Sequence, residues 1–503
     1  MDNEDFCKKS NKPYWNYKKN TSKNFCNVIG KEKPNIKTIE NELILIYNSD
    51  LKTYELAELD NRQISNNSYI FGLDKNSNLR NIKIDQIIEY PNSISYKIAF
   101  KHGTLSLSEH HSLLSVDKNL NIIKIPVKKI EVGMPILMPR QINIIENHSP
   151  LDFSNCGEVF EEDGIEYVKR ARTKAFRFIK KDFDLGYILG HYCSEGSMNQ
   201  VVVSCGNQKA EIEKVSVLVE NNFGFSPSIG KHDKKRYDTV YTVDAYSQLA
   251  KLIFTIGIGL KPKYAPLKEI PPFMYNAPKE CVKGFLVGFT KGDGSIGDYI
   301  RNREFQASPS RDVLYRLNSS SKKLIFGLNF LLKRFGVVAE FKTREFDNKK
   351  HPTWHDSYVL AINSKANLKK LREFIPDLPE YGKFARGKDI VINLNPWMKK
   401  INEEMKRMYK ISLRMLAERK NIPFIAAKCS QEQFKKNISE YRLLKTLKYL
   451  IQNDYKTLTT MKLWEIFSKF TFTRVKEVEI NCEHINAYKL IIPYFGIHIA
   501  GIG

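Results

Sequence analysis

The sequence is short of acidic residues, of paired cysteines and of long apolar runs, and each shortage excludes a class of protein. Asp and Glu number 56 against 80 Lys and Arg, so the formal net charge is +24. Such a charge favours a densely negative partner, most often nucleic acid, although an AT-rich genome that encodes many lysines would produce the same excess. The eight cysteines include no Cys-x-x-Cys pair, which argues against a zinc module and against a disulfide framework.

Membrane and secretory features are also missing. No apolar run approaches membrane-spanning length. The first residues, MDNEDFCKKSNKPYWNYKKN, contain no apolar segment of a signal peptide. We therefore expect an intracellular protein with no membrane partner, in a compartment that the sequence leaves open.

An apolar content of 42% and an aromatic content of 12% describe a globular chain, and 503 residues give room for about three domains. Residue patterns divide the chain into four predicted parts. Residues 1–36 are a flexible basic leader, and residues 37–150 form a β-domain of short alternating runs that is completed by 469–503. After a charged connector, residues 180–392 form a mixed helix and strand domain. Residues 393–468 form a basic helical insert.

Residues 180–392 contain an internal repeat. Each copy opens with a glycine-punctuated helix and continues with a helix that ends on Phe-Gly, KAEIEKVSVLVENNFGF in the first copy and SKKLIFGLNFLLKRFGV in the second. A strand and a further helix follow in both. Two copies of one helix and strand unit predict a pseudo-twofold domain.

The opening helices of the two copies are the strongest functional signal. They read GYILGHYCSEG and GFLVGFTKGDG, and their glycines recur every four residues at Gly186, Gly190, Gly284 and Gly288. Residues four apart lie on one helical face, so each helix has a face without side chains on which another backbone could pack closely. If the two helices pack in parallel, Glu195 and Asp293 meet at one end of the interface. The following glycines, Gly196 and Gly294, are suited to ending a helix.

Two adjacent carboxylates repel each other unless a cation lies between them. Carboxylate oxygens favour Mg²⁺, and a metal held by two acids on a basic protein indicates phosphodiester hydrolysis. The alternative is that the glycines only allow helix packing and that the acids are solvated. Recurrence of the acid at the same place in both copies favours the metal site. No organic cofactor is expected.

These residues resemble the two dodecapeptide motifs of the LAGLIDADG homing endonucleases. The resemblance implies an α+β fold in which two pseudo-symmetric αββαββα halves form a DNA-binding saddle. It implies that Glu195 and Asp293 are metal-binding catalytic acids, that Mg²⁺ is the cofactor, and that Lys268 and Lys383 lie near the scissile phosphates. Lys291 departs from the motif, which more often has an acid there. The partner implied is double-stranded DNA with a long non-palindromic site, cut in both strands by a monomer.

The flanking β-domain resembles the Hint domain of inteins. In YKIAFKHGTLSLSEHHSLLSVD, Ser108 and His111 occupy the positions of a Thr-x-x-His splicing block. The N-terminal nucleophile is missing, because Lys37 or Thr38 stands near its position, and no terminal His-Asn precedes Gly503. The resemblance therefore implies an intein-derived endonuclease that does not splice, with Ser108 and His111 as remnants.

Three alternatives stay open at this point. The chain could be a non-cleaving LAGLIDADG nucleic-acid binder or an intron maturase, or a splicing-competent intein whose sequence is truncated. The β-domain, through Lys128, Lys129 and Arg140, and the helices of 393–468 could extend the contact with DNA phosphates.

Overall fold

A computed structural model describes most of the chain after residue 42. The described residues are 43–49, 53–58, 68–73, 79–84, 86–109, 111–197, 201–206, 208–232, 240–260, 264–301, 310–346, 355–379, 395–420 and 440–491. The predicted leader 1–36 lies outside them, as do Lys37, Thr38 and Lys383. Within these ranges, none of the helices is both long enough and apolar enough for a membrane span.

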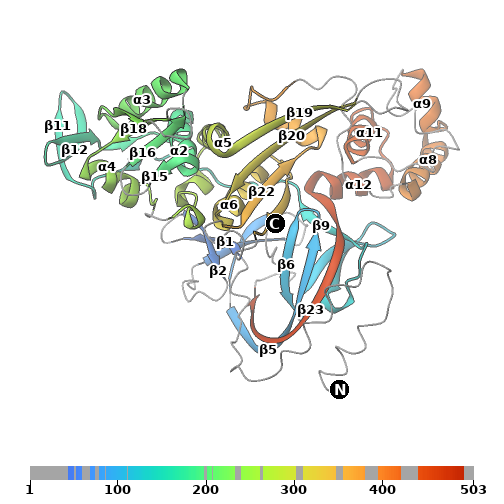
Figure 1. Cartoon of the computed structure of the whole chain (residues 1–503). Helices are drawn as coiled ribbons and strands as arrows, with labels where there is room; N and C mark the ends of the chain where they lie inside the picture. Colours follow the sequence, from blue (N-terminus) through green and yellow to red (C-terminus); the bar gives the residue numbers. More distant parts are fainter. Residues whose placement is uncertain are drawn as a thin grey trace.

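Residues 183–372 contain the same series of helices and strands twice (Figure 1). The first series is α2 (Phe183–Glu195), β15 (Gly196–Ser197), β16 (Val201–Gly206), α3 (Lys209–Phe223), β17 (Ser228–His232), β18 (Val240–Ala245) and α4 (Gln248–Leu252). The second is α5 (Lys279–Asp293), β19 (Gly294–Arg301), β20 (Ser310–Ser319), α6 (Lys322–Arg334), β21 (Glu340–Arg344), β22 (Ser357–Ile362) and α7 (Lys365–Arg372). Their sheets have the strand orders β15-β16-β18-β17 and β19-β20-β22-β21, which are the same connectivity. The predicted mixture of helices and sheets is confirmed.

Local sequence explains these elements. In β20, Val313, Tyr315 and Leu317 are buried while the residues between them are not, the period of two that places one face of a strand on a core. Asp182 caps α2 by accepting a hydrogen bond from the Leu185 amide at 3.0 Å. The η2 turn (Ile253–Gly257), η3 (Ala265–Leu267) and η4 (Pro272–Asn276) lead from the first series to the second.

The segment between residues 150 and 180 is not the plain connector that its charge suggested. It contains β10 (Leu151–Asp152), β11 (Glu158–Glu162), β12 (Ile165–Arg170), β13 (Thr173–Phe176) and β14 (Phe178–Ile179). β11, β12 and β13 form an antiparallel sheet. Phe160, Tyr167 and Phe176 stack across it with ring centroids 5.5 Å apart. Val168 and Ala175 pair across this sheet and are buried while the residues on either side of them are not, and that period of two is typical of strands.

The N-terminal strands form a sheet of their own, with the order β2-β1-β3-β4. The strands are β1 (Leu43–Asn48), β2 (Thr53–Glu58), β3 (Ser68–Leu73) and β4 (Leu79–Lys83). Their buried Leu45, Tyr54 and Phe71 belong to the large core that the two repeated series share. The Phe71 ring lies 5.8 Å from that of Phe330 on α6. Packing therefore ties this sheet directly to the second half of the repeat.

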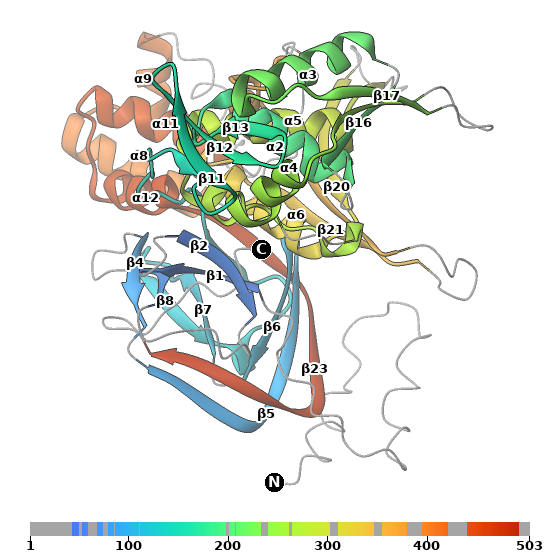
Figure 2. The same cartoon turned by 90° about the vertical axis from the view of Figure 1, so that its left-hand side faces the viewer.

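The remaining β-structure joins segments from the two ends of the sequence. β5 (Gln86–Phe100), β6 (Gly103–Ser108), β9 (Pro135–Pro139) and β23 (Phe470–Ile491) form a sheet of order β6-β5-β23-β9. β23 pairs with β9 through Phe470–Arg474 and with β5 from Val475 onward. Figure 2 shows β5 and β23 as two long strands side by side. β7 (Ser112–Val116) and β8 (Ile122–Pro126), followed by η1 (Val127–Lys129), make a separate hairpin.

Four helices precede β23 and have their own core. They are α8 (Asn395–Tyr409), α9 (Leu413–Arg419), α11 (Glu440–Gln452) and α12 (Leu458–Lys469). Ile401, Leu447 and Phe467 are fully buried in this core. The core also includes Leu114 of β7 and Leu137 of β9, which belong to the strands β5 to β9 and β23, here called the β-region. The helical segment is thus packed onto the β-region. Its limits, like the other predicted domain limits, stay predictions.

Candidate active site

The two glycine-punctuated helices, α2 and α5, touch through their backbones. A Cβ atom would lie only 1.9–2.1 Å from a carbonyl oxygen of the other helix at each of the four predicted interface glycines, Gly186, Gly190, Gly284 and Gly288. Real Cβ atoms essentially never come within 3.0 Å of such an atom. No residue larger than glycine can therefore occupy these positions unless the helices move apart.

The contacts also give the direction of packing. Gly284 faces Phe183, and Gly288, one turn later, faces Tyr187. Both helices therefore run the same way, and their C-terminal ends lie together. At that end a Cβ atom on Gly292 would lie 2.6 Å from Cγ of Glu195. The structure thus brings Glu195 beside the residue that precedes Asp293.

The pKa of Asp293 shows the electrostatic environment at this end of the helix pair. The pKa of Asp293 is raised to about 7, first because its carboxyl group is buried and second because the Glu195 carboxylate is near. The Lys268 ammonium acts in the opposite direction. Glu195 is exposed and Asp293 is half-buried, so one acid faces solvent while the other is held against the helices.

Lys268 is held close to the two acids. Its Nζ donates a hydrogen bond to the Ser194 carbonyl at 2.8 Å, and its own carbonyl accepts one from the Ser321 hydroxyl at 2.6 Å. Burial lowers the pKa of Lys268, and Cys193, Asp293 and Glu195 oppose that change. Ser321 caps α6, so Lys268 connects the end of α2 with the second half of the repeat.

Gly196 and Gly294 end α2 and α5, as predicted. Both are extended, with φ of −72° and −89°, and lead straight into β15 and β19. Neither uses the left-handed conformation by which glycine usually ends a helix. A Cβ atom at Gly294 would instead lie 2.5 Å from the Thr290 carbonyl oxygen, and one at Gly196 would lie 2.3 Å from that of Tyr192. Glycine is needed here for space.

The other predicted residues lie elsewhere. Lys291, the departure from the motif, forms an ion pair with Asp377 at 2.8 Å. Ser108 ends β6, and its carbonyl accepts a hydrogen bond of 3.0 Å from the His111 amide. The strand β6 lies away from α2 and α5 in Figure 1. Lys383 lies outside the described residues.

His191 was not predicted, although it lies on α2 one turn before Glu195. It is buried, and its Nε2 is 3.5 Å from Oε1 of Glu211 on α3, which also accepts a hydrogen bond from the Tyr187 hydroxyl. Burial lowers the pKa of His191, and the Glu211 carboxylate opposes this. The feature of the sequence that could have identified His191 is a histidine inside an apolar helix with glycines every four residues.

The residues at the end of α2 and α5 fit a divalent cation. The pKa of Asp293 is raised first by burial and second by Glu195, so a negative charge there is unfavourable, and a bound cation would offset both effects. In the described ranges no group of three or more His, Cys, Asp and Glu side chains could hold a metal ion. Two carboxylates would thus leave most ligand positions to water and phosphate oxygens, as is usual for Mg²⁺.

Comparison with known proteins supports part of this interpretation. Residues 280–376 match the family of the LAGLIDADG-like domain. The match runs from α5 to α7 and so covers the second half of the repeat. The LAGLIDADG resemblance of the GFLVGFTKGDG segment is therefore confirmed.

Longer matches are weaker. The chain is 22% identical over 451 residues to the DNA-directed RNA polymerase subunit Rpo1C of Methanocaldococcus jannaschii, covering 84% of this chain and 47% of that protein. It is 20% identical over 351 residues to the glutamine–fructose-6-phosphate aminotransferase of the same organism, covering 68% of this chain and 29% of that protein. The chain thus spans less than half of each of these relatives.

Among solved structures, the I-LtrWI LAGLIDADG homing endonuclease bound to target DNA aligns with 50% of this chain and 99% of its own. The identity is 11% and the TM-score is 0.24, too low to define a common fold.

Gly288→Ala is expected to destabilise the chain by at least about 2 kcal/mol, because the added methyl group would collide with the α2 backbone. The gain in helix propensity, about 1 kcal/mol, does not offset this. Urea unfolding followed by circular dichroism measures the effect. Gly164→Ala is the control: its φ is +75° and no atom lies within 4 Å of the new methyl group. The control should cost only about 1 kcal/mol of backbone strain. Equal losses would contradict the close packing.

The pH dependence of stability follows from Asp293. The carboxyl group titrates near 3.8 in the unfolded chain and at about 7 in the folded one. Between these values only the folded chain keeps the proton, so stability falls as pH rises from about 4 to about 7. In EDTA, Asp293→Asn should therefore raise the melting temperature at pH 8 and change it little at pH 4. Asp163→Asn, at an exposed turn, should have no such pH dependence. A melting-temperature gain that is the same at both pH values would contradict the assignment.

Proposed function

We propose that this chain is a site-specific endonuclease that makes a metal-dependent double-strand break in DNA. One observation carries the proposal. The glycine faces of α2 and α5 let two backbones touch, and that contact puts Glu195 and Asp293 together at one end of the helix pair. Two carboxylates, a nearby lysine and a strongly basic chain form a combination suited to phosphodiester hydrolysis.

The proposed roles follow from position. Glu195 and Asp293 would hold Mg²⁺, which supplies Lewis-acid stabilisation of the phosphate and activation of water. Lys268, tethered to Ser194, would keep a positive charge beside the acids and next to the scissile phosphate. Lys383 stays a candidate for the equivalent position next to the scissile phosphate of the second DNA strand. Because each half of the repeat supplies one acid, a single chain would complete the site, and we propose a monomer.

A non-palindromic target follows from the sheets. β15 and β19 both begin with Gly-Ser. The residues that pair with the two serines therefore occupy equivalent positions in the two sheets. Ser197 pairs with Val202, whereas Ser295 pairs with Arg316. An aliphatic side chain and a guanidinium group read different features of a base pair or a phosphate. We therefore infer pseudo-symmetric halves that face unlike half-sites in a long duplex. A DNA substrate would place the activity inside the cell.

We further propose that the chain is intein-derived. Two features support this origin. The sheet β6-β5-β23-β9 joins sequence on both sides of the repeat, as expected if the endonuclease was inserted into an existing β-domain. In addition, more than two thirds of the chain aligns with an RNA polymerase subunit and 68% of it with an aminotransferase, proteins with unrelated names. A segment shared by such proteins behaves as an insertion that moves between genes.

Selection of cleaved sites from a randomised DNA library, with Mg²⁺ and with EDTA, tests the proposed activity. We expect cleavage only with Mg²⁺, at a long asymmetric site. Glu195→Gln and Asp293→Asn should each lower the cleavage rate by more than about a hundredfold, because residues that only orient metal ligands already contribute up to that much. DNA binding should be largely kept.

Glu213→Gln is the matched control, since Glu213 is an exposed acid on α3. It should cleave like the unchanged chain. Full activity of either acid variant would exclude the proposed metal site. Binding of a selected sequence without any nicking would favour the alternative of a non-cleaving binder or maturase.

Loss of splicing is a separate prediction. The chain lacks a Cys or Ser near Lys37 and Thr38, and a histidine such as His111 has no nucleophile to activate there. Intact-mass analysis of the chain expressed between two carrier proteins should give only the full fusion. Appearance of the two joined carriers would mean that splicing is retained.

A further inference from the structure

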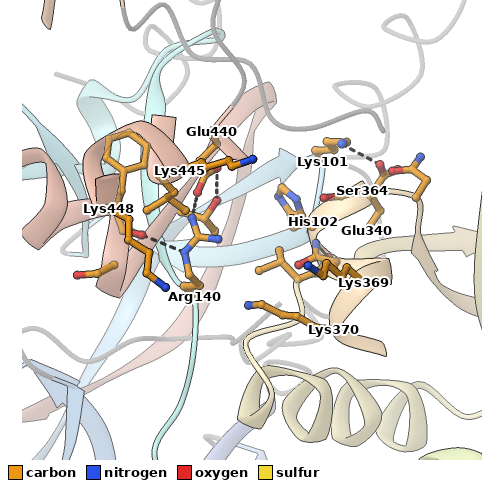
Figure 3. A pocket seen from close by; sticks show the side chains of 18 of the residues that line it. Lys101, His102, Arg140, Glu340, Ser364, Lys369, Lys370, Glu440, Lys445 and Lys448 are labelled. Carbon is orange, nitrogen blue, oxygen red and sulfur yellow. Dashed lines mark hydrogen bonds and ion pairs between the residues drawn. The ribbon is translucent and has the colours of Figure 1, made fainter. Parts of the chain in front are cut away.

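A pocket of about 610 Å³ lies where three parts of the fold meet (Figure 3). One wall comes from β22 and α7 of the second half of the repeat. Another comes from α11 and α12, including Trp464. The turn between β5 and β6 and the residue after β9 complete it with Lys101, His102 and Arg140. Its volume suits a ligand of nucleotide size.

Two ion pairs hold these parts together. Lys101 pairs with Glu340 of β21 at 2.8 Å, and Arg140 pairs with Glu440 of α11. The Arg140 Nε also donates to the Phe467 carbonyl at 3.0 Å. Figure 3 shows the two pairs on opposite sides of the pocket. Each pair connects the β-region to a different neighbour, so the walls are fixed by contacts that need no ligand.

After this pairing the pocket keeps an excess of positive charge. Six lysine and arginine side chains line it against three glutamates. Lys369 of α7 and Lys448 of α11 are exposed, and neither forms an ion pair within the described part of the chain. The charge that remains is therefore available to a ligand from two sides of the pocket.

The partly buried Lys370 adds to this positive charge. The pKa of Lys370 is lowered to about 8 by burial and by the neighbouring Arg140, with Glu373 opposing. His102 adds no charge to the pocket, because burial and then Lys101 and Lys333 lower its pKa to about 3 and keep the imidazole neutral. Lys333 itself is buried, and its Nζ has no hydrogen-bond partner among the described residues. An anion in the pocket would lower the cost of collecting these charges.

We propose that the pocket binds phosphate esters, with Lys369 and Lys448 as the principal contacts. Phosphate groups accept several charge-assisted hydrogen bonds from lysines. The partly buried Trp464 offers an aromatic surface on which a nucleobase can stack. The phosphate comes either from a free nucleotide or from the backbone of DNA that extends past the saddle. This site is separate from Glu195 and Asp293 and does not depend on the proposed nuclease activity.

Isothermal titration calorimetry of the full chain in EDTA tests the proposal with three probes: inorganic pyrophosphate, ATP and a long random-sequence duplex. Lys369→Ala combined with Lys448→Ala should weaken binding of at least one probe by more than about tenfold. The control carries Lys209→Ala and Lys399→Ala, which remove two exposed lysines away from the pocket. It should stay within about twofold for every probe.

The pattern of losses identifies the phosphate source. Weaker pyrophosphate and ATP binding with unchanged duplex binding assigns a free nucleotide, and the reverse assigns the DNA backbone. Glu373→Gln, which removes a negative charge from the lining, should tighten the same probe. Equal losses in the pocket and control variants, or no saturable binding of any probe, would overturn the proposal. Because cleavage is not measured, failure of the nuclease proposal would leave this test intact.

Discussion

The close backbone contact between α2 and α5 is the constraint on which the rest of the structure depends. Four glycines allow carbonyl oxygens of one helix to occupy the space that a Cβ atom of the other would need. Each glycine costs about 1 kcal/mol of helix stability relative to alanine, so the packing must offset several such terms. In return for this loss of helix stability, the glycines allow the two helices to pack more closely. Helices that touch at their backbones bring their ends closer together than helices separated by side chains.

That contact determines what lies on either side of it. Each helix is followed directly by the first strand of its own sheet, so the two sheets extend from one helix pair. Glu195 and Asp293 are the last helical residues before those strands. The main chain therefore places the two acids at the same end of the helix pair, and the pKa of Asp293 is raised first by burial and second by the nearby Glu195 carboxylate.

A second constraint comes from β23. Its first residues extend the β9 edge and its later residues pair along β5, so the last described strand completes a sheet begun early in the chain. The helices α8, α9, α11 and α12 are thereby held against the β-region, and α11 and α7 line the same pocket. The positively charged pocket at this junction exists only because both constraints act in one molecule.

Several features were readable from the sequence because they depend on local spacing. The four-residue glycine interval predicted the helix faces, and the recurring motif predicted a repeated series of helices and strands. The segment 150–180 resembles a connector in sequence because charged residues outnumber the few buried ones, such as Val168 and Ala175, that define its strands. Gly196 and Gly294 end their helices as predicted, but their extended conformation could not be predicted, because the residue type is the same for an extended and a left-handed glycine.

The sequence by itself determined which helix faces carry only glycine and which acid follows each of these helices, since both depend on positions a few residues apart. Only the tertiary structure decided that the helices run parallel, that Lys268 reaches Ser194, and that His191 lies beside Glu211. It alone placed Lys369 and Lys448 around one pocket. These residues are far apart along the chain, and no local rule of spacing or propensity specifies which distant surfaces will meet.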